Sequence, residues 1–519
     1  MQKIHLNIID ILLLCYITIA GCYFYVTSQH ETNLWEISKL CAFILCYTIA
    51  KKITQKQWVL WGIITLGVIE VVICFCQKNH WIDCSHSTFE MTGTFNNPGP
   101  LGGYLSIAIT VVLGLYWEHR KSTRLKWILF IVFILLSFTI IFTESRAGWL
   151  SVLIASISLF LFNRKGGRRS FTLMQKIGII IPICLFISFI YYYKKDSADG
   201  RLLIWRVSIE IIADAPLTGH GIGTFEKKYM YYQAEYFKTH PHSKYENLAD
   251  NVAYPYNEFL RIGVEQGVIG IILILGIILI LFRYTSYQKY NNIYLGAFIS
   301  LITFSLFSYP FDVLLLWLLI PLLLGGMQYK KAICISTNCK IQLIEGIIGI
   351  ICLVIIVKNG HNYYRLEKSI RQLHSSSFQH RKKAEAYIEK HQKRLEATPR
   401  LFDIYAQYCY QNLPSIKSLT ILRRAAEVIP SAELYCDLGD IYKKQGQIGK
   451  AQNCYSLAEN MIPIRLLPKY KLFCLYRDAG DSVKMHEIGH KTLLIKIKVP
   501  NTKALRIKGD IKRTLEYSN

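Results

Sequence analysis

Long apolar runs recur along this chain, and they constrain its fold more than any other feature. A helix of about 20 residues crosses the hydrocarbon core of a bilayer, and the runs here are close to that length. Inside lipid the backbone has to satisfy its own hydrogen bonds, so helices are expected. The sequence therefore predicts an all-α, polytopic membrane helix bundle of about eleven spans, near residues 8–27, 35–50, 57–77, 101–117, 127–143, 147–163, 177–193, 267–283, 293–308, 313–328 and 342–357.

The orientation of these spans follows from the loops that carry lysine and arginine, because short basic loops stay on the cytoplasmic side. By this rule the N-terminus is cytoplasmic, and the interval 194–266 and the chain after the last span lie on the outer side. The first apolar run lacks a small-residue cleavage site and is expected to remain as an anchor. The basic loops are 51–56, 118–126, 163–170, 283–289 and 329–331.

The segment after the last span carries a helical-repeat pattern. Tyr476 and Gly480 stand 34 residues after Tyr442 and Gly446, which indicates a second copy of one unit. Such a repeat supplies a docking surface for a protein partner, although a generic helical hairpin is the alternative. The order of large and small residues in 431–463 follows the tetratricopeptide signature through Tyr435, Leu438, Gly439, Tyr442, Ala451, Tyr455, Ala458 and Pro463.

These features divide the chain into a membrane domain (1–357), a basic helical linker (358–397), tetratricopeptide-like helices (398–500) and a basic tail (501–519). The net charge of +25 lies mostly in the inner loops and the tail. A basic domain beside a membrane suggests anionic lipid or glycan, and no nucleic-acid partner is expected. Neither a nucleotide-binding loop nor a metal-ligand spacing occurs in the sequence, so no cofactor and no metal are predicted.

The stretch 200–225, GRLLIWRVSIEIIADAPLTGHGIGTF, is the most informative part of the outer interval. On a predicted helix 201–214, Arg206 has Glu210 and Asp214 at helical spacing, which favours a surface ion pair. Arg201 has no carboxylate at that spacing and suits a phosphate group, with snorkelling to lipid headgroups as the alternative. The residues that end the helix and allow a tight elbow are Pro216, Gly219, Gly221 and Gly223.

Two further ionisable residues stand in or beside apolar runs. Arg146 lies in a short hairpin at the outer membrane edge, where it is costly without a partner. It is a second candidate for binding phosphate, and pairing with Glu144 or snorkelling is the alternative. Glu70 lies deeper in a span, and a packed, hydrogen-bonded role is favoured over a functional one.

Four patches of the sequence resemble the O-antigen ligase and O-antigen polymerase superfamily of integral-membrane glycosyltransferases. They are TGTFNNPGPLGGYL (92–105), SRAGWL (145–150), the stretch 200–225, and YNEFLRIGVEQGVIG (256–270). Each patch is weak alone, but their order and their spacing to the spans make the combination specific. The resemblance covers roughly residues 90–330.

This resemblance implies an enzyme of the bacterial inner membrane that transfers a glycan from an undecaprenyl-diphosphate carrier to an acceptor on the outer face. The acceptor would be lipid A-core, a glycan or a protein, in lipopolysaccharide or other cell-surface polysaccharide biosynthesis. The family places arginines on the diphosphate, a role for Arg146 and Arg201 and also for Arg206. The alternatives are a repeat-unit polymerase, a protein O-oligosaccharyltransferase, and a non-enzymatic flippase or assembly scaffold for lipid-linked glycan.

The sequence departs from the family pattern where a general base is expected. Ligases of this family carry a histidine directly before the asparagine of the last patch, and this chain has Tyr256 before Asn257. Tyrosine is a poor base at neutral pH. The groups that could replace the histidine are His220, His240, His242, Asp250 and Glu258. The candidate catalytic residues are therefore Arg146, Arg201, His242, Tyr256, Asn257 and Glu258.

Overall fold

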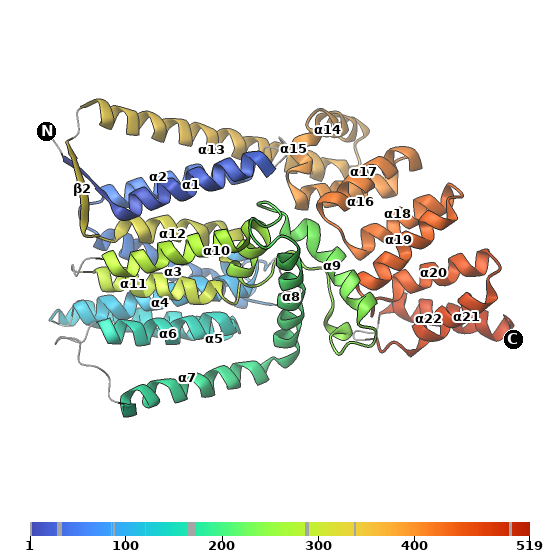
Figure 1. Ribbon diagram of the computed structural model, residues 1–519, viewed down its shortest axis with the longest axis horizontal. Helices are drawn as coiled ribbons and strands as arrows, with labels where there is room; N and C mark the ends of the chain where they lie inside the picture. Colours follow the sequence, from blue (N-terminus) through green and yellow to red (C-terminus); the bar gives the residue numbers. More distant parts are fainter. Residues whose placement is uncertain are drawn as a thin grey trace. The chain divides into compact units, whose positions relative to one another are not determined.

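The computed structural model describes residues 3–27, 34–84, 86, 89–119, 121–162, 173–285, 290–336, 339–497 and 501–518. The chain is predominantly helical (Figure 1). Strands β1 (Lys3–Asn7) and β2 (Lys331–Ser336) form one antiparallel pair. The helices are α1 (Ile8–Thr27), α2 (Leu34–Lys52), α3 (Gln57–Lys78), α4 (Pro98–Glu118), α5 (Thr123–Phe142), α6 (Arg146–Phe162), α7 (Leu173–Tyr193), α8 (Lys195–Asp214), α9 (Phe225–Thr239), α10 (Glu258–Tyr284), α11 (Asn291–Ser305), α12 (Leu314–Gly326), α13 (Cys339–Leu373), α14 (Phe378–Lys390), α15 (Gln392–Glu396), α16 (Pro399–Asn412), α17 (Ser415–Val428), α18 (Ala432–Lys444), α19 (Ile448–Met461), α20 (Leu466–Asp478), α21 (Ser482–Leu494) and α22 (Thr502–Ser518), with short 3-10 turns η1 (Gly93–Phe95), η2 (Glu246–Leu248) and η3 (Pro310–Asp312).

Each apolar run predicted from the sequence overlaps one helix of the set α1–α7 and α10–α13. Among the described residues, five helices are long and apolar enough to cross a membrane: Gln57–Lys78, Pro98–Glu118, Thr123–Phe142, Glu258–Tyr284 and Ile344–Leu373. Shorter apolar helical segments are Ile8–Thr18, Arg146–Phe162, Ile180–Tyr193 and Leu314–Gly326. The predicted helical fold is confirmed, while the count of eleven spans stays a prediction. The predicted inner loop 163–170 and residues 286–289 lie outside the described residues.

The chain folds as two compact units. The first contains Met1–Val26, Trp35–Lys195 and Pro255–Asn359. The second is built mainly from Asp196–Tyr254 and Gly360–Asn519. A segment from the middle of the chain, which includes α8 and α9, therefore folds together with the C-terminal helices.

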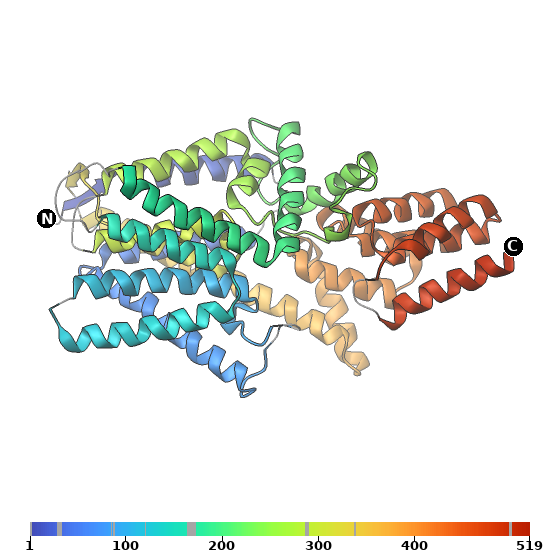
Figure 2. The ribbon, with the colours of Figure 1, turned by 90° about the horizontal axis from the view of Figure 1, so that it is seen from below.

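Helix α4 forms the core of the first unit, whose helices run alongside one another in both views (Figures 1 and 2). It is buried along most of its length and packs against α3, α5, α6 and α11. Glycines allow this close approach: a Cβ on Gly103 would come within 2.5 Å of the Phe304 ring. Small residues at helix contacts are typical of membrane bundles, where close packing rather than hydrophobicity drives association.

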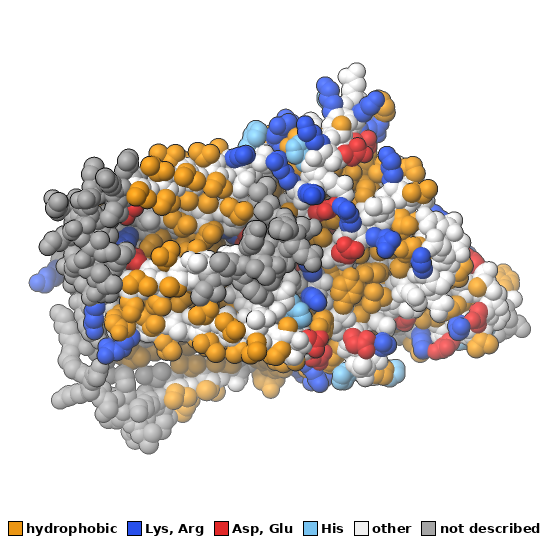
Figure 3. All heavy atoms as spheres, turned by 45° about the horizontal axis from the view of Figure 1, so that its top comes forward, with side chains coloured by type: hydrophobic (Ala, Val, Ile, Leu, Met, Phe, Trp, Pro, Cys, Tyr) orange, Lys and Arg blue, Asp and Glu red, His pale blue; other side chains and the backbone are white. Residues whose placement is uncertain are grey.

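Many outward side chains of the first unit are hydrophobic, and they cover much of the face that Figure 3 shows. Phe138 on α5 is 62% exposed and Ile350 on α13 is 65% exposed, and both belong to long runs of such residues. An apolar surface of this extent is unfavourable in water and favourable in lipid. The surface of the first unit therefore fits a protein embedded in a membrane.

The C-terminal helices of the second unit contain two equivalent turns. Gly446 between α18 and α19 has a φ of 73°, and Gly480 between α20 and α21 has a φ of 72°. In the first turn Gln447 N–H donates to the carbonyl of Tyr442, and in the second Asp481 N–H donates to the carbonyl of Tyr476. The two glycines are 480 − 446 = 34 residues apart. The geometry supports an internal repeat of that length, and its tetratricopeptide identity stays a prediction.

Candidate functional site

The loop between α3 and α4 is held by two buried polar side chains of α3. The amide oxygen of Gln77 accepts hydrogen bonds from the N–H groups of Thr92 (3.0 Å) and Gly93 (2.9 Å). Glu70 accepts from the N–H (2.9 Å) and the hydroxyl (2.6 Å) of Thr94. These contacts confirm a packed, hydrogen-bonded role for Glu70. They also give Gly93 and Thr94 of the first motif patch a structural role, since a Cβ on Gly93 would lie 2.2 Å from Glu70 and the Thr94 hydroxyl donates to it.

The second motif patch packs directly against the first. The Ser145 hydroxyl donates to the carbonyl of Gly99 across 3.2 Å. A Cβ added to Gly102 would lie 2.3 Å from the Ser145 Cβ, and one added to Gly148 would lie 2.7 Å from the Gly102 oxygen. The glycines of these patches are therefore needed for backbone contact between α4 and the start of α6.

Arg146, the first residue of α6, holds the end of α7. Its Nη1 donates to the carbonyl oxygens of Ile190 (3.0 Å) and Lys194 (2.9 Å). The last carbonyls of a helix lack partners within the helix and carry partial negative charge, so a guanidinium is stabilising there. Lys194 in turn forms an ion pair with Glu144. A capping role for Arg146 is thus observed, and its role on a diphosphate stays a prediction.

The fourth motif patch begins with a helix cap. The Asn257 side-chain oxygen accepts from the N–H groups of Phe259 (2.9 Å) and Leu260 (3.2 Å), which makes it the N-cap of α10. Tyr256 before it has a φ of 52°, and its ring lies edge-on to Tyr309 at 5.5 Å between centroids. The asparagine of the motif therefore has a structural role as the N-cap of α10.

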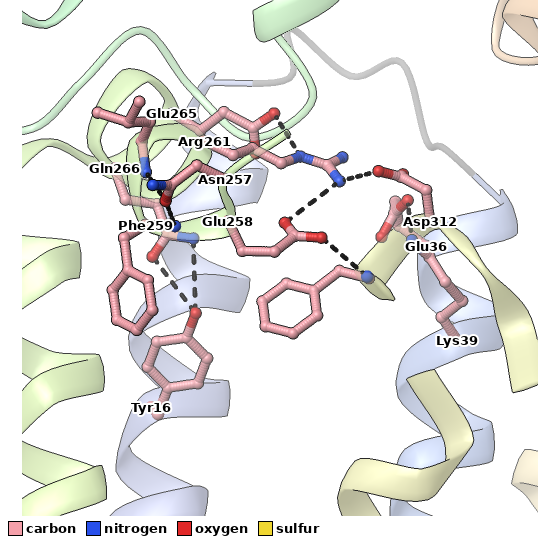
Figure 4. Close-up of polar contacts among 12 residues, drawn as sticks. Tyr16, Glu36, Lys39, Asn257, Glu258, Phe259, Arg261, Glu265, Gln266 and Asp312 are labelled. Atoms are coloured by element: carbon pink, nitrogen blue, oxygen red, sulfur yellow. Dashed lines mark hydrogen bonds and ion pairs between the residues drawn. The ribbon is translucent and has the colours of Figure 1, made fainter. Parts of the chain in front are cut away.

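Glu258 follows the cap and is almost fully buried, with 2% of its surface exposed. Its Oε1 accepts from the N–H of Phe311 at 2.9 Å. Its Oε2 lies 3.9 Å from Nη1 of Arg261 and has no hydrogen-bond partner within the described part of the chain (Figure 4). A buried carboxylate oxygen without a donor is costly to maintain.

Arg261 is the cationic centre of this cluster. Its Nε donates to Glu265 at 3.3 Å, and its Nη1 forms an ion pair with Asp312 in η3 (Figure 4). Helix α2 adds Glu36 and Lys39, whose charged groups are 2.7 Å apart. Carboxylates therefore outnumber cations at the start of α10. We call Glu36, Lys39, Glu258, Arg261, Glu265 and Asp312 the α10 charge cluster.

A break in α10 separates this cluster from the apolar part of the helix. Gly267 has a φ of 66° and a ψ of −165°, which no helical residue adopts. Just before it, the Tyr16 hydroxyl donates to the Gln266 side chain at 3.4 Å. The break coincides with the residue at which the sequence predicted the span to begin.

The two other candidate arginines lie on α8, which begins at Lys195 rather than at the predicted residue 201. Arg201 is partly exposed. Arg206 stacks on the Tyr236 ring of α9 at 5.4 Å, an aromatic contact that the sequence did not indicate. Burial raises the pKa of Glu210, while Arg206 and His240 act to lower it. The ion pair between Arg206 and Glu210 stays a prediction.

The chain turns between α8 and α9, where the sequence predicts an elbow. Gly219, Gly221 and Gly223 have φ values of 69°, 107° and 78°, a backbone region that other residues adopt only with strain. In this elbow the His220 ring lies 3.0 Å from the carbonyl of Ile211. The glycines thus serve the turn.

The candidate histidines after α9 differ in their surroundings. The His240 ring stacks on Tyr236 at 4.6 Å between centroids. His242 is exposed and has a φ of 63°. These residues belong to the second unit, as do Arg201 and Arg206, whereas Arg146, Tyr256, Asn257 and Glu258 belong to the first.

Sequence reasoning missed Arg261 and Asp312. Arg261 stands three residues after Glu258 and four before Glu265, so helical spacing alone could have revealed it. No local signal marks Asp312, because its contact with Arg261 joins residues 51 positions apart. In the described ranges no group of three or more His, Cys, Asp or Glu side chains is arranged to hold a metal ion.

Part of the chain, residues 130–275, is similar to a known protein family. These residues match a family model described as O-Antigen ligase. The match includes the second, third and fourth motif patches, and it confirms the resemblance to the O-antigen ligase superfamily. The first patch, 92–105, lies before the matched residues. No curated protein and no solved structure matches the chain.

Proposed function

Since residues 130–275 carry the O-antigen ligase match, we propose that this protein transfers a glycan from an undecaprenyl-diphosphate-linked donor to an acceptor at the outer face of the bacterial inner membrane. The general class, a membrane glycosyltransferase of the O-antigen ligase and polymerase type, rests on the family match. The carrier-linked donor and the direction of transfer are what the family resemblance implies, and the residues of the site supply the proposed roles.

The observation that carries the proposal is the unbonded carboxylate oxygen of Glu258, one residue after the motif asparagine. A hydroxyl that reaches Oε2 supplies the hydrogen-bond donor that this buried oxygen lacks. Glu258 then acts as the general base that the family's histidine would provide. Because the carboxylate is 2% exposed, the acceptor has to part the first turn of α10 from η3 on entry.

The reaction replaces one bond at the anomeric carbon by another. The acceptor oxygen forms the new glycosidic bond and gives its proton to Glu258. The bond from the anomeric carbon to the carrier phosphate breaks, and undecaprenyl diphosphate leaves with an additional negative charge. We assign the positive charge that stabilises this leaving group to Arg146 and, on α8, to Arg201 and Arg206.

Deletion of the gene tests the proposal and separates its variants. Accumulation of long carrier-linked chains identifies a ligase, and accumulation of single carrier-linked repeat units identifies a polymerase. Loss of glycan from a protein, with surface polysaccharide unchanged, identifies a protein oligosaccharyltransferase. Carrier-linked glycan that fails to reach the outer leaflet would instead support a flippase and end the enzyme proposal.

Charge reversal tests the arginines in the intact protein. Arg201→Glu and Arg146→Glu should abolish transfer while the protein is still produced and carrier flipping is normal. Arg146→Glu also removes the cap on α7, so its folded amount has to be measured beside its activity. Unchanged glycan products in both variants would refute the leaving-group role.

A further inference from the structure

Helix α9 of the outer interval is bound by the C-terminal helices of the same unit (Figure 1). The Tyr231 hydroxyl donates to the carbonyl of Ala426 at 2.9 Å and lies 2.9 Å from the hydroxyl of Tyr435. Gln233 is completely buried and donates to the carbonyl of Met461 at 2.7 Å. These contacts join residues about two hundred positions apart.

Charged groups close the same interface beside α9. Arg465, just before α20, forms ion pairs with Asp250 (2.8 Å) and with Glu433. The Asn251 side chain donates to Glu433 at 2.7 Å. The contacts of Asp250 with Arg465 and of Asn251 with Glu433 cross from the interval 194–266 to the C-terminal helices. The pair of Arg465 with Glu433 links these two contacts. The interface therefore combines buried polar contacts with a charged rim.

The other side of α9 contacts α8. The Tyr232 hydroxyl is hydrogen-bonded to Asp214 at the end of α8, and the Tyr236 ring lies under Arg206. Contacts thus run without a gap from the C-terminal helices through α9 to α8, the helix that carries Arg201. The surface of the helices that faces α9 is already occupied by the chain itself.

We propose that the C-terminal helices are a positioning element for glycan transfer: they fix α9, and α9 fixes α8 with its arginines. Gln233, Asp250 and Arg465 are positioning residues in this scheme. The inference rests on the proposed function, because it assigns Arg201 to the donor diphosphate. It explains why a helical tail is joined to a membrane enzyme without requiring a separate protein to occupy this surface.

A charge swap in the full-length protein tests the inference. Arg465→Glu places like charges beside Asp250 and Glu433 and should loosen α9. The triple variant with Asp250→Arg and Glu433→Arg restores opposite charges on the two sides. Lys443→Glu is the matched control, because Lys443 pairs with Asp478 entirely within the C-terminal helices.

Two measurements are made on each variant in nanodiscs. Hydrogen exchange reports the protection of residues 225–251, and steady-state kinetics report KM for the lipid-linked donor and kcat. Displacement of a positioned group by about 1 Å can cost on the order of 100-fold in rate, so Arg465→Glu should lower kcat/KM at least about tenfold. The triple variant should recover both protection and kcat/KM, and the control should change neither.

The outcomes separate the inference from the proposed function. Faster exchange with unchanged kinetics in Arg465→Glu, or lost transfer that the triple variant fails to recover, would overturn the positioning role. If the unmodified protein transfers no glycan although the exchange pattern changes and recovers as described, the interface stands and the proposed function fails, and the positioning role fails with it.

Discussion

Replacing Glu258 by glutamine is the most direct test of the site. The substitution keeps the size of the side chain and the Oε1 acceptor that receives the Phe311 N–H at 2.9 Å. Arg261 keeps its bonds to Glu265 and Asp312, and it loses only the longer contact of 3.9 Å to Glu258. The free energy of unfolding should therefore fall by only about 1–3 kcal/mol, the cost of a buried amide NH2 without an acceptor.

The effect on transfer should be larger. Glutamine cannot take a proton from the acceptor, and its NH2 group would face the acceptor hydroxyl where Oε2 now lies. A positioned general base contributes on the order of 10²–10⁴ in rate. At about 1.4 kcal/mol for each factor of ten, the loss corresponds to about 3–5 kcal/mol of transition-state stabilisation.

The assay is consumption of undecaprenyl-diphosphate-linked glycan by purified protein in nanodiscs, with thermal unfolding measured on the same sample. Glu70→Gln is the matched control, since Glu70 is a buried carboxylate of the same unit whose two oxygens both have donors. That variant should lose stability and should retain transfer in proportion to its folded fraction. Transfer by Glu258→Gln within about threefold of the unmodified enzyme would refute the base assignment.

Three further results are expected. Arg201→Ala should lower transfer by about 100-fold and Arg201→Lys by less, because lysine keeps the charge without the bidentate geometry; donor-concentration series measure both. Gly93→Ala should cost about 1–3 kcal/mol in thermal unfolding, since its φ is 56° and its Cβ would lie 2.2 Å from Glu70, whereas Gly62→Ala has open space and should be neutral. Burial and Asp440 raise the pKa of Asp437 to about 7, so the stability that this group contributes is complete below about pH 4 and lost as the pH rises through 7. Asp437→Asn should accordingly raise the unfolding temperature at pH 8 and leave it almost unchanged at pH 4.

The helices of this protein could be predicted because their signal is local. A run of apolar residues in lipid has no alternative to a helix, and the glycines of the elbow or of the turns at Gly446 and Gly480 act on their own backbone. The helix of Arg201 was recognised for the same reason. Its start was misplaced by six residues, since the polar segment 195–200 carries no apolar periodicity.

The contacts that assemble the site could not be predicted, because nothing in the neighbourhood of one partner specifies the other. Asp312 contacts Arg261 only once α10 and η3 are packed together. Gln233 contacts Met461 only once α9 is packed against the C-terminal helices. Hydrogen bonds of this kind are fixed by tertiary packing. The contacts of Gln233 and Tyr231 also change the interpretation of the C-terminal helices. The sequence predicts a docking surface for a partner protein, and the surface that faces α9 is occupied by α9 itself.

The motif residues themselves divide into two groups once their contacts are known. Gly93, Gly102 and Ser145 hold backbone segments in contact, and Asn257 starts a helix, so their conservation in a motif would need no chemistry. Glu258 is different, because its backbone position would be satisfied by any helix-forming residue and its burial is costly. One of its carboxylate oxygens accepts from η3 and the other has no donor among the described residues, and the proposed general-base role rests on that observation. Since the first group accounts for the scaffold, loss of transfer without loss of folding in Glu258→Gln is the result that would separate chemistry from structure in this motif.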